Sequence, residues 1–104
     1  MRSILILIGS GPRTPQAEQA LSLAVRLCQA GHQLRIALIQ DASLMALARP
    51  GCSVPAAVSL YVVDEDLRLR GCRKEDVVPG VRIVDRSELV DLMMEQSDAV
   101  MGAF

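Results

Sequence analysis

Three cysteines are the residues of this chain best suited to covalent chemistry. Cys28, Cys52 and Cys72 contain no pair spaced as CxxC, and the only histidine is His32. An odd number of thiols in this arrangement indicates neither a disulfide framework nor a zinc site, so we expect free thiols and no metal or cofactor. A thiol that acts as a nucleophile must be accessible and partly ionised. The residues around each cysteine therefore indicate which thiol could react.

Cys72 is the first candidate for a reactive thiol, and Cys52 is the second. Arg70, Arg73 and Lys74 surround Cys72 and favour its thiolate, whereas Cys52 lies in a loop rich in proline and glycine. The position of Cys72 just after a predicted helix opposes ionisation, because the helix dipole is negative there. An ordinary structural role for both cysteines therefore stays open as the alternative.

The third cysteine, Cys28, lies on the apolar stripe of a predicted helix together with Ala20 and Ala24. A cysteine in such a stripe usually packs as a small apolar residue. We expect Cys28 to be an inert part of the core.

A set of polar residues follows the predicted strands. Ser10 and Gly11 follow the first strand, Asp41 the second and Asp64 the third. Because ligands of open parallel sheets bind at the carboxyl ends of the strands, these four residues form a predicted ligand crevice. Helix capping accounts for Asp41, Asp64 and Asp85 without any ligand, and it is the stronger explanation for these aspartates. We expect no metal site among them.

Apolar and β-branched runs alternate with helical segments along the chain. Strands are predicted at 3–9, 32–40, 58–63, 81–84 and 99–104, and helices at 15–30, 42–48, 65–70 and 86–96. This alternation predicts an α/β fold, with one three-layer α/β/α domain over residues 1–104 and a mainly parallel sheet of four to five strands. The first strand has no polar alternation, so we expect it at the centre of the sheet.

The composition excludes several classes of protein. Of the 104 residues, 51% are hydrophobic but only 2% are aromatic, which predicts an aliphatic core. A formal net charge of −1 argues against direct binding to nucleic acid or to an anionic membrane surface. The apolar run at 4–8 is too short for a signal peptide or for a membrane span of roughly 20 residues, so we expect a cytoplasmic protein.

The segment LYVVDEDLRLRG, residues 60–71, resembles the corresponding part of the DsrE/DsrF/DsrH sulfur-relay proteins, also called TusD/TusC/TusB. The similarity is greatest to the DsrH/TusB branch and extends over most of the chain. It includes Ala30-Gly31-His32, Ile39-Gln40-Asp41, Gly80-Val81 and Asp85-x-x-Glu88-Leu89-Val90, in DsrH/TusB-like order. The resemblance implies persulfide transfer in tRNA thiolation or sulfur oxidation.

The resemblance also implies where a sulfur-carrying cysteine would stand. In DsrE-like members it lies at the strand-to-helix junction, which falls here at Val63 or Asp64. In DsrH-like members that carry a cysteine, it lies early in the first helix, around Ala20 of this chain. Since neither position is cysteine, we expect a non-catalytic or partner-dependent subunit of a sulfur-relay assembly. The alternative is a stand-alone module that binds a small ligand in the predicted crevice or has a regulatory role.

Two predicted helices carry wider apolar arcs than packing against a sheet requires. Each arc covers about 200°, where little more than 100° suffices. The surplus predicts a homo-oligomer, in particular a dimer, or a hetero-oligomer with related sulfur-relay subunits. The contact residues that we expect are Leu23, Val25, Leu92, Met93 and Met94. Packing of one surplus beneath the loop at 49–55 is the competing explanation.

Overall fold

The computed structural model describes residues 2–11, 14–47 and 58–103, with only the backbone of Ala103. The strands are β1 (Ser3–Ile8), β2 (Gln33–Leu38), β3 (Ser59–Val63), β4 (Val81–Val84) and β5 (Ala99–Ala103). The α-helices are α1 (Pro15–Gln29), α2 (Asp64–Leu69) and α3 (Arg86–Met94), and the 3-10 helices are η1 (Gln40–Ala46) and η2 (Lys74–Asp76). The predicted loop at 49–55 lies outside the described residues, as does Cys52.

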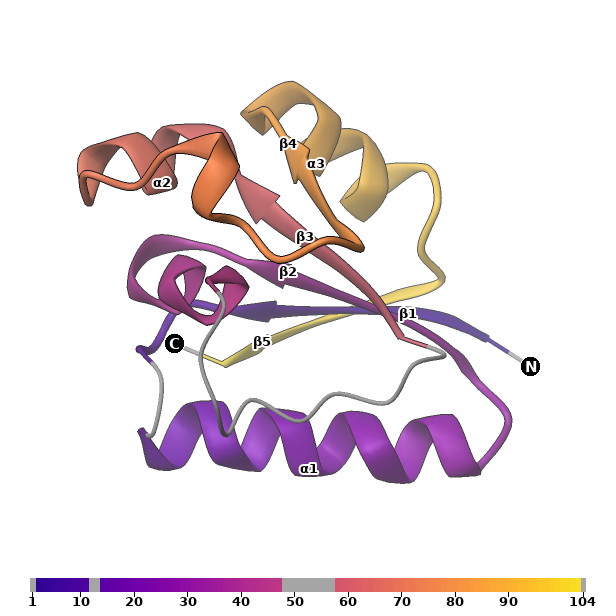
Figure 1. Cartoon of the computed structure of the whole chain (residues 1–104). Coiled ribbons are helices and arrows are strands. Elements are labelled where there is room, and N and C mark those ends of the chain that lie inside the picture. The colour runs from indigo at the N-terminus through magenta and orange to yellow at the C-terminus, as the bar shows by residue number, and fades with distance from the viewer. Residues whose placement is uncertain (1, 12–13, 48–57, 104) are drawn as a thin grey trace.

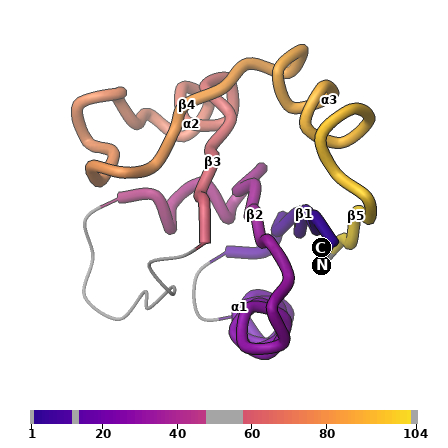
Figure 2. Tube along the Cα trace, turned by 90° about the vertical axis from the view of Figure 1, so that its right-hand side faces the viewer, coloured from indigo at the N-terminus to yellow at the C-terminus, as the bar shows by residue number. Residues whose placement is uncertain are grey.

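The strands form one five-stranded sheet in the order β4-β3-β2-β1-β5, and all neighbouring strands are parallel (Figure 1). The prediction of an α/β fold with a parallel sheet is therefore confirmed. β1 is an interior strand, paired with β2 and β5, as its unbroken apolar sequence indicated, but the middle position of the sheet belongs to β2. Helix α1 covers one face of the sheet and α3 covers the other (Figure 2).

The alternating side chains of β1 enter two separate apolar clusters. Ile4, Ile6 and Ile8 pack on the face that α1 covers, together with the alanines of that helix. Leu5 and Leu7 pack on the opposite face, against α3. Each fully buried side chain of this size contributes about 1.5–3 kcal/mol to the free energy of unfolding. The strand is thus fixed by burial on both of its faces.

Local signals in the sequence set most of the element boundaries. Thr14 caps α1 by accepting a hydrogen bond from the Ala17 N–H at 3.2 Å, and Asp85 caps α3 in a reciprocal pair with Glu88. Gly71 has a φ of +71°, which a glycine adopts without strain, and it follows the end of α2 as predicted. These caps and this stop confirm the boundaries that the sequence indicated.

Two predicted caps differ in the structure. The predicted α-helix after β2 is a 3-10 helix that begins at Gln40, and Asp41 lies in its first turn without capping it. Asp64 is the first residue of α2, whose cap position is Val63 and has no side-chain cap. Capping by Asp41 and Asp64 was therefore a wrong prediction, because both carboxylates bind arginine side chains instead.

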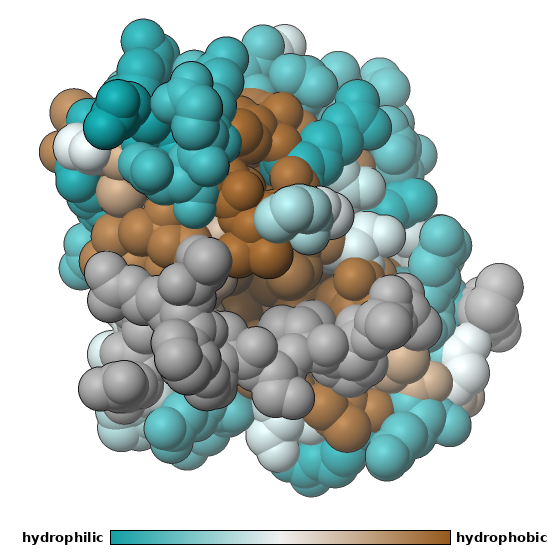
Figure 3. Space-filling model, in the orientation of Figure 1, coloured by the Kyte–Doolittle hydropathy of each residue, from teal (hydrophilic) through white to brown (hydrophobic). Residues whose placement is uncertain are grey.

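The predicted burial of β3 holds only for part of the strand. Val62 and Val63 are buried, whereas Leu60 and Tyr61 are half-buried. β4 pairs with β3 from Leu60 to Val63, so these two side chains are exposed on the faces of the sheet and not for want of a neighbouring strand. Apolar surface remains visible in the middle of the face drawn in Figure 3.

No described helix is long and apolar enough to cross a membrane.

Candidate functional site

A hollow of about 390 Å³ lies at the carboxyl ends of the central strands, on the edge where the sequence predicted a ligand crevice. Its walls combine apolar side chains with two arginines and one carboxylate. The lining residues are Ile39, Gln40, Val63, Asp66, Leu69, Arg70, Arg86 and Leu89. The hollow lies on the predicted edge of the sheet, but none of the four residues predicted to form the crevice lines it.

Asp66 is the buried charged group of this hollow, with 7% of its surface exposed. Its Oδ2 accepts a hydrogen bond of 2.9 Å from the backbone N–H of Gln40. Gln40 has a φ of +50°, in the left-handed region that residues other than glycine seldom adopt. The carboxylate therefore joins the start of α2 to the end of β2 and holds the backbone in this conformation.

Arg70 extends this polar connection to the rim of the hollow. Its Nε and Nη2 donate to Oδ1 of Asp41 at 3.1 and 3.0 Å, and its Nη1 donates to the backbone carbonyl of Asp66 at 3.1 Å. Asp41 is exposed, so its ion pair is worth at most about 1 kcal/mol, while Asp66 fixes the guanidinium from the protein side. Arg70 is one of the basic residues expected to favour a Cys72 thiolate. Its guanidinium instead pairs with the carboxylates of Asp41 and Asp66.

The other predicted crevice residues are only partly brought together. Gly11 lies next to Asp41, since a Cβ built on Gly11 would be 3.6 Å from the Asp41 Cβ. Asp64 instead pairs with Arg68 at 3.5 Å and is not part of the hollow's lining, and neither is Ser10. Ion pairing therefore accounts for Asp64 without a ligand.

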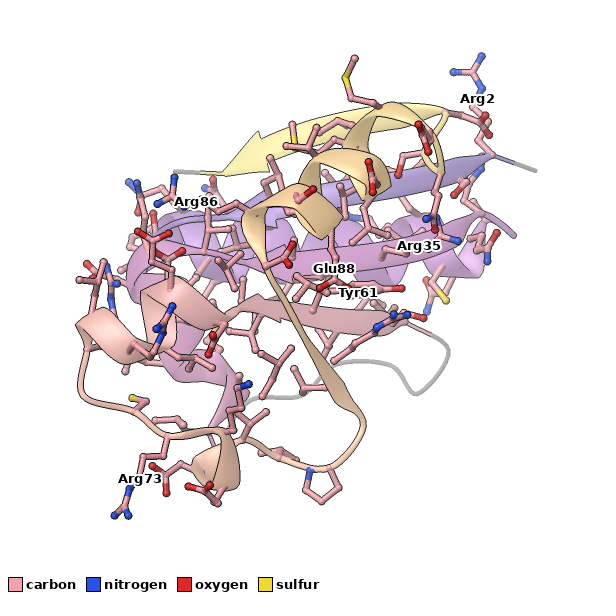
Figure 4. All side chains as sticks on the ribbon, turned by 90° about the horizontal axis from the view of Figure 1, so that it is seen from above. Arg2, Arg35, Tyr61, Arg73, Arg86 and Glu88 are labelled. Carbon is pink, nitrogen blue, oxygen red and sulfur yellow. The ribbon has the colours of Figure 1, made fainter. Side chains whose placement is uncertain are left out.

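Cys72 is half-buried and packs against the larger apolar cluster. Its thiol lies 3.7 Å from the backbone carbonyl of Arg70, to which it donates a weak hydrogen bond. Arg73 stands on the surface, where Figure 4 shows it at the outer margin of the molecule. Cys28 is also half-buried against the same cluster, as expected of a core residue.

The sequence did not identify Arg86 as part of the site. Its Nε donates to Oε2 of Glu65 at 2.6 Å, which links the first turns of α3 and α2 beside the hollow. The two residues are 21 positions apart, and their contact depends on the pairing of β3 with β4. A capping box at Asp85 and an acidic first turn were visible, but the contact between the two turns required the strand order.

A second, smaller hollow of about 190 Å³ lies between α3 and the strands β3 and β4. Tyr61 and Glu88 lie close together in its wall (Figure 4). Arg82 in the same wall approaches Glu88 at 3.8 Å. Within the described residues, no group of three or more His, Cys, Asp and Glu side chains could hold a metal ion.

The expected contact residues occupy different environments. Leu92 is buried at 5% exposure and Met93 packs against the same cluster, so both contribute to the fold of the single chain. Leu23 and Val25 are half-buried, while Met94 is 77% exposed. Of the predicted contact surface, Met94 is the side chain most available to a partner.

A protein-family model described as "DsrH like protein" matches residues 13–99. The chain belongs to the DsrH-like family. The resemblance seen in residues 60–71 is thereby confirmed, including its closeness to the DsrH branch. The sequence matches no curated protein.

The solved structures that share the fold of this DsrH-like chain include YchN and Tm0979. The YchN protein from E. coli has a TM-score of 0.82 at 23% identity, with 98% of this chain and 99% of that chain covered. Protein Tm0979 from Thermotoga maritima, solved by NMR, has a TM-score of 0.60 at 26% identity, with 86% and 90% covered. The similarity to YchN at near-full length agrees with the five-stranded α/β architecture.

Proposed function

We propose that this DsrH-like chain is a non-catalytic or partner-dependent subunit of a sulfur-relay assembly, which moves persulfide sulfur in tRNA thiolation or sulfur oxidation. Membership of the DsrH-like family supports the sulfur-relay part of the proposal. The absence of cysteine at both expected carrier positions supports a subunit that is non-catalytic or depends on a partner. The assembly consists of copies of this chain or of this chain with related subunits.

The observation that carries the proposal is the environment of the two positions where related proteins place a carrier cysteine. Ala20 is buried on the core side of α1, at 5% exposure. Asp64 forms an ion pair with Arg68 at the start of α2. A methyl group cannot accept sulfur, and a carboxylate at a helix start lowers the tendency of nearby thiols to ionise. Neither position can therefore substitute for the carrier thiol.

Persulfide trapping followed by mass spectrometry tests whether this chain carries sulfur by itself. The purified chain is incubated with cysteine and a cysteine desulfurase, and each cysteine peptide is examined for the mass of one added sulfur atom. We expect no added sulfur on the chain alone. Label on Cys72 or Cys52 would make this chain a carrier and would contradict the proposal. Cys28→Ser serves as the control, because Cys28 packs in the core.

Mixing with related subunits tests the assembly part of the proposal. We expect native mass spectrometry to show a complex of this chain with DsrE-like and DsrF-like proteins, and sulfur transfer through the complex to depend on this chain. If Cys72 takes up sulfur only within that complex, the chain is a partner-dependent carrier. Absence of any complex, with transfer rates unchanged by the chain, would refute the proposal.

A stand-alone ligand-binding module is the second candidate function. The hollow at the carboxyl edge favours it, because Gln40 in its wall has a left-handed backbone and such conformations often occur at ligand sites. A library of small metabolites can be screened by amide chemical-shift changes. Shifts confined to Gln40, Arg70 and Arg86 would support this function, and changes elsewhere or none at all would contradict it.

A further inference from the structure

The hollow at the carboxyl ends of the strands combines a basic rim with an apolar wall. Its charged lining residues are two arginines, Arg70 and Arg86, and one aspartate, Asp66. Most of the remaining wall is aliphatic and consists of Ile39, Val63, Leu69 and Leu89. Its volume of about 390 Å³ lies within the range of roughly 300–1,000 Å³ that is typical of small-molecule sites. A matching ligand is small, with a polar head group and an aliphatic body.

Leu69 is the most exposed apolar side chain of this wall. It is the last residue of α2 and is 72% exposed, whereas Val63 in the same wall is buried. An aliphatic ligand that lies along Leu69 and Leu89 would remove apolar area from water, which is favourable in proportion to that area. Among the described residues that line the hollow, none is aromatic, so a nucleobase would find no ring on which to stack.

Arg86 offers a polar anchor beside this wall, at the end of the sheet toward which β5 points (Figure 4). Its Nε donates to Glu65, and within the described residues its terminal amino groups, Nη1 and Nη2, donate no hydrogen bond. These two groups form an edge of the guanidinium that can bind both oxygens of a carboxylate. The contact with Glu65 holds the side chain in place, which lowers the entropy lost when a ligand binds.

The carboxylates around the hollow are already engaged. Asp66 accepts a hydrogen bond from the Gln40 N–H at 2.9 Å and lies 3.9 Å from Nη1 of Arg70. Asp41 and Glu65 pair with the two arginines from outside the lining. Since these carboxylates have cationic partners while one guanidinium edge has no acceptor among the described residues, the hollow favours an anion over a cation.

We propose that the hollow binds a small aliphatic carboxylate. Its head group pairs with the Nη1–Nη2 edge of Arg86, and its chain packs along Leu69 and Leu89. Two donors satisfy a carboxylate, whereas a phosphate group has three strong acceptor oxygens. The proposal rests on the second candidate function, ligand binding in this hollow, and names the chemistry of the ligand. It does not depend on the sulfur-relay function.

A titration with hexanoate, followed by NMR at constant ionic strength, is the first test. We expect saturable shifts of the amide signals of Gln40, Arg70 and Arg86. Hexanamide has the same chain without the charge and should bind about fivefold more weakly. Affinity should rise from acetate through butanoate to hexanoate, by about fourfold for each methylene group that the hollow buries.

Arg86→Gln should weaken hexanoate binding by about fivefold, because the head group loses its cationic partner. Arg82→Gln is the matched control. The Arg82 side chain is 71% exposed and pairs with a glutamate, as does that of Arg86 at 69%, but Arg82 does not line this hollow. The control should bind hexanoate with unchanged affinity, and the circular dichroism of both variants should match that of the unmodified chain.

A second pair of variants tests the apolar wall. Leu69→Ser should reduce the gain in affinity for each methylene group. Met94→Ser changes a side chain of similar exposure on α3, at 77%, and should leave that gain unchanged.

Three results would each overturn the proposal: equal affinity for hexanoate and hexanamide, equal affinity for acetate and hexanoate, or hexanoate binding that Arg86→Gln does not weaken. If neutral metabolites shift the same amide signals and hexanoate does not, the ligand-binding function stands and the carboxylate ligand is refuted. If no compound shifts them, both are refuted. Persulfide trapping decides the sulfur-relay function separately.

Discussion

Replacing Asp66 should reduce stability far more than replacing any other carboxylate of the carboxyl edge. Asp66→Ala leaves the Gln40 N–H without its acceptor and Arg70 without its inner carboxylate. A hydrogen bond to a charged acceptor is worth about 1.5–3 kcal/mol. Because this hydrogen bond is only partly buried, water can replace the lost acceptor, and we expect Asp66→Ala to lower the free energy of unfolding by about 1.5–3 kcal/mol.

Urea denaturation followed by circular dichroism measures this loss. The transition midpoint should fall while its slope stays constant, since a stability change alone does not alter the surface exposed on unfolding. Glu65→Ala is the matched control, because Glu65 precedes Asp66 in the same helical turn but forms an exposed ion pair with Arg86. Its loss should cost no more than about 1 kcal/mol.

The comparison of these two variants decides the role of Asp66. If Asp66→Ala and Glu65→Ala lose the same amount, within about 0.5 kcal/mol, the buried carboxylate does not hold β2 and α2 together. Asp66→Asn is informative as well, because its side-chain oxygen can still accept from the Gln40 N–H. It should retain part of the stability that Asp66→Ala loses.

Four further outcomes are expected. Asp85→Ala should destabilise the protein by about 0.5–2 kcal/mol in urea denaturation through loss of the α3 cap, and an effect below that range would contradict the role of the capping box. Gly71→Ala should cost about 1–2 kcal/mol in the same assay from backbone strain alone, because no atom lies within 4 Å of the added Cβ. Leu5→Ala should cost about 3–5 kcal/mol, because Leu5 is fully buried, and it should lower the thermal midpoint accordingly. Met94→Glu should weaken any dimer that uses the exposed end of α3, and light scattering that shows no weakening would exclude this surface.

Signals confined to a few neighbouring residues predicted the boundaries of the helices. Thr14 and Pro15 at the start of α1, Gly71 after α2 and the reciprocal pair of Asp85 and Glu88 act within one helical turn. Their effects depend on the local backbone only. The interior place of β1 was also predictable, because a strand buried on both faces needs an unbroken apolar sequence.

The residues that line the hollow at the carboxyl ends of the strands could not be predicted from such local signals. Asp66 contacts Gln40 across 26 residues, and Arg70 contacts Asp41 across 29. Both contacts exist only because β2 and β3 are neighbours in the sheet. Asp41 had a local explanation as a helix cap, yet its carboxylate accepts hydrogen bonds from the distant guanidinium of Arg70 instead. Long-range geometry of this kind is absent from local sequence patterns.

The pairing of β1 with β5 has a consequence for how the chain folds during its synthesis. The backbone N–H of Ser3 donates to the carboxylate of Asp98, which is 95 residues further along the chain. β1 is therefore synthesised long before β5 can pair with it. At a synthesis rate of about 5–20 residues per second, that interval lasts several seconds. Throughout it, the edge of β1 that will receive β5 has no partner strand, and Leu5 and Leu7 on this strand are without their final cover. A nascent chain of this topology depends on keeping that edge away from other chains until residues 99–103 emerge.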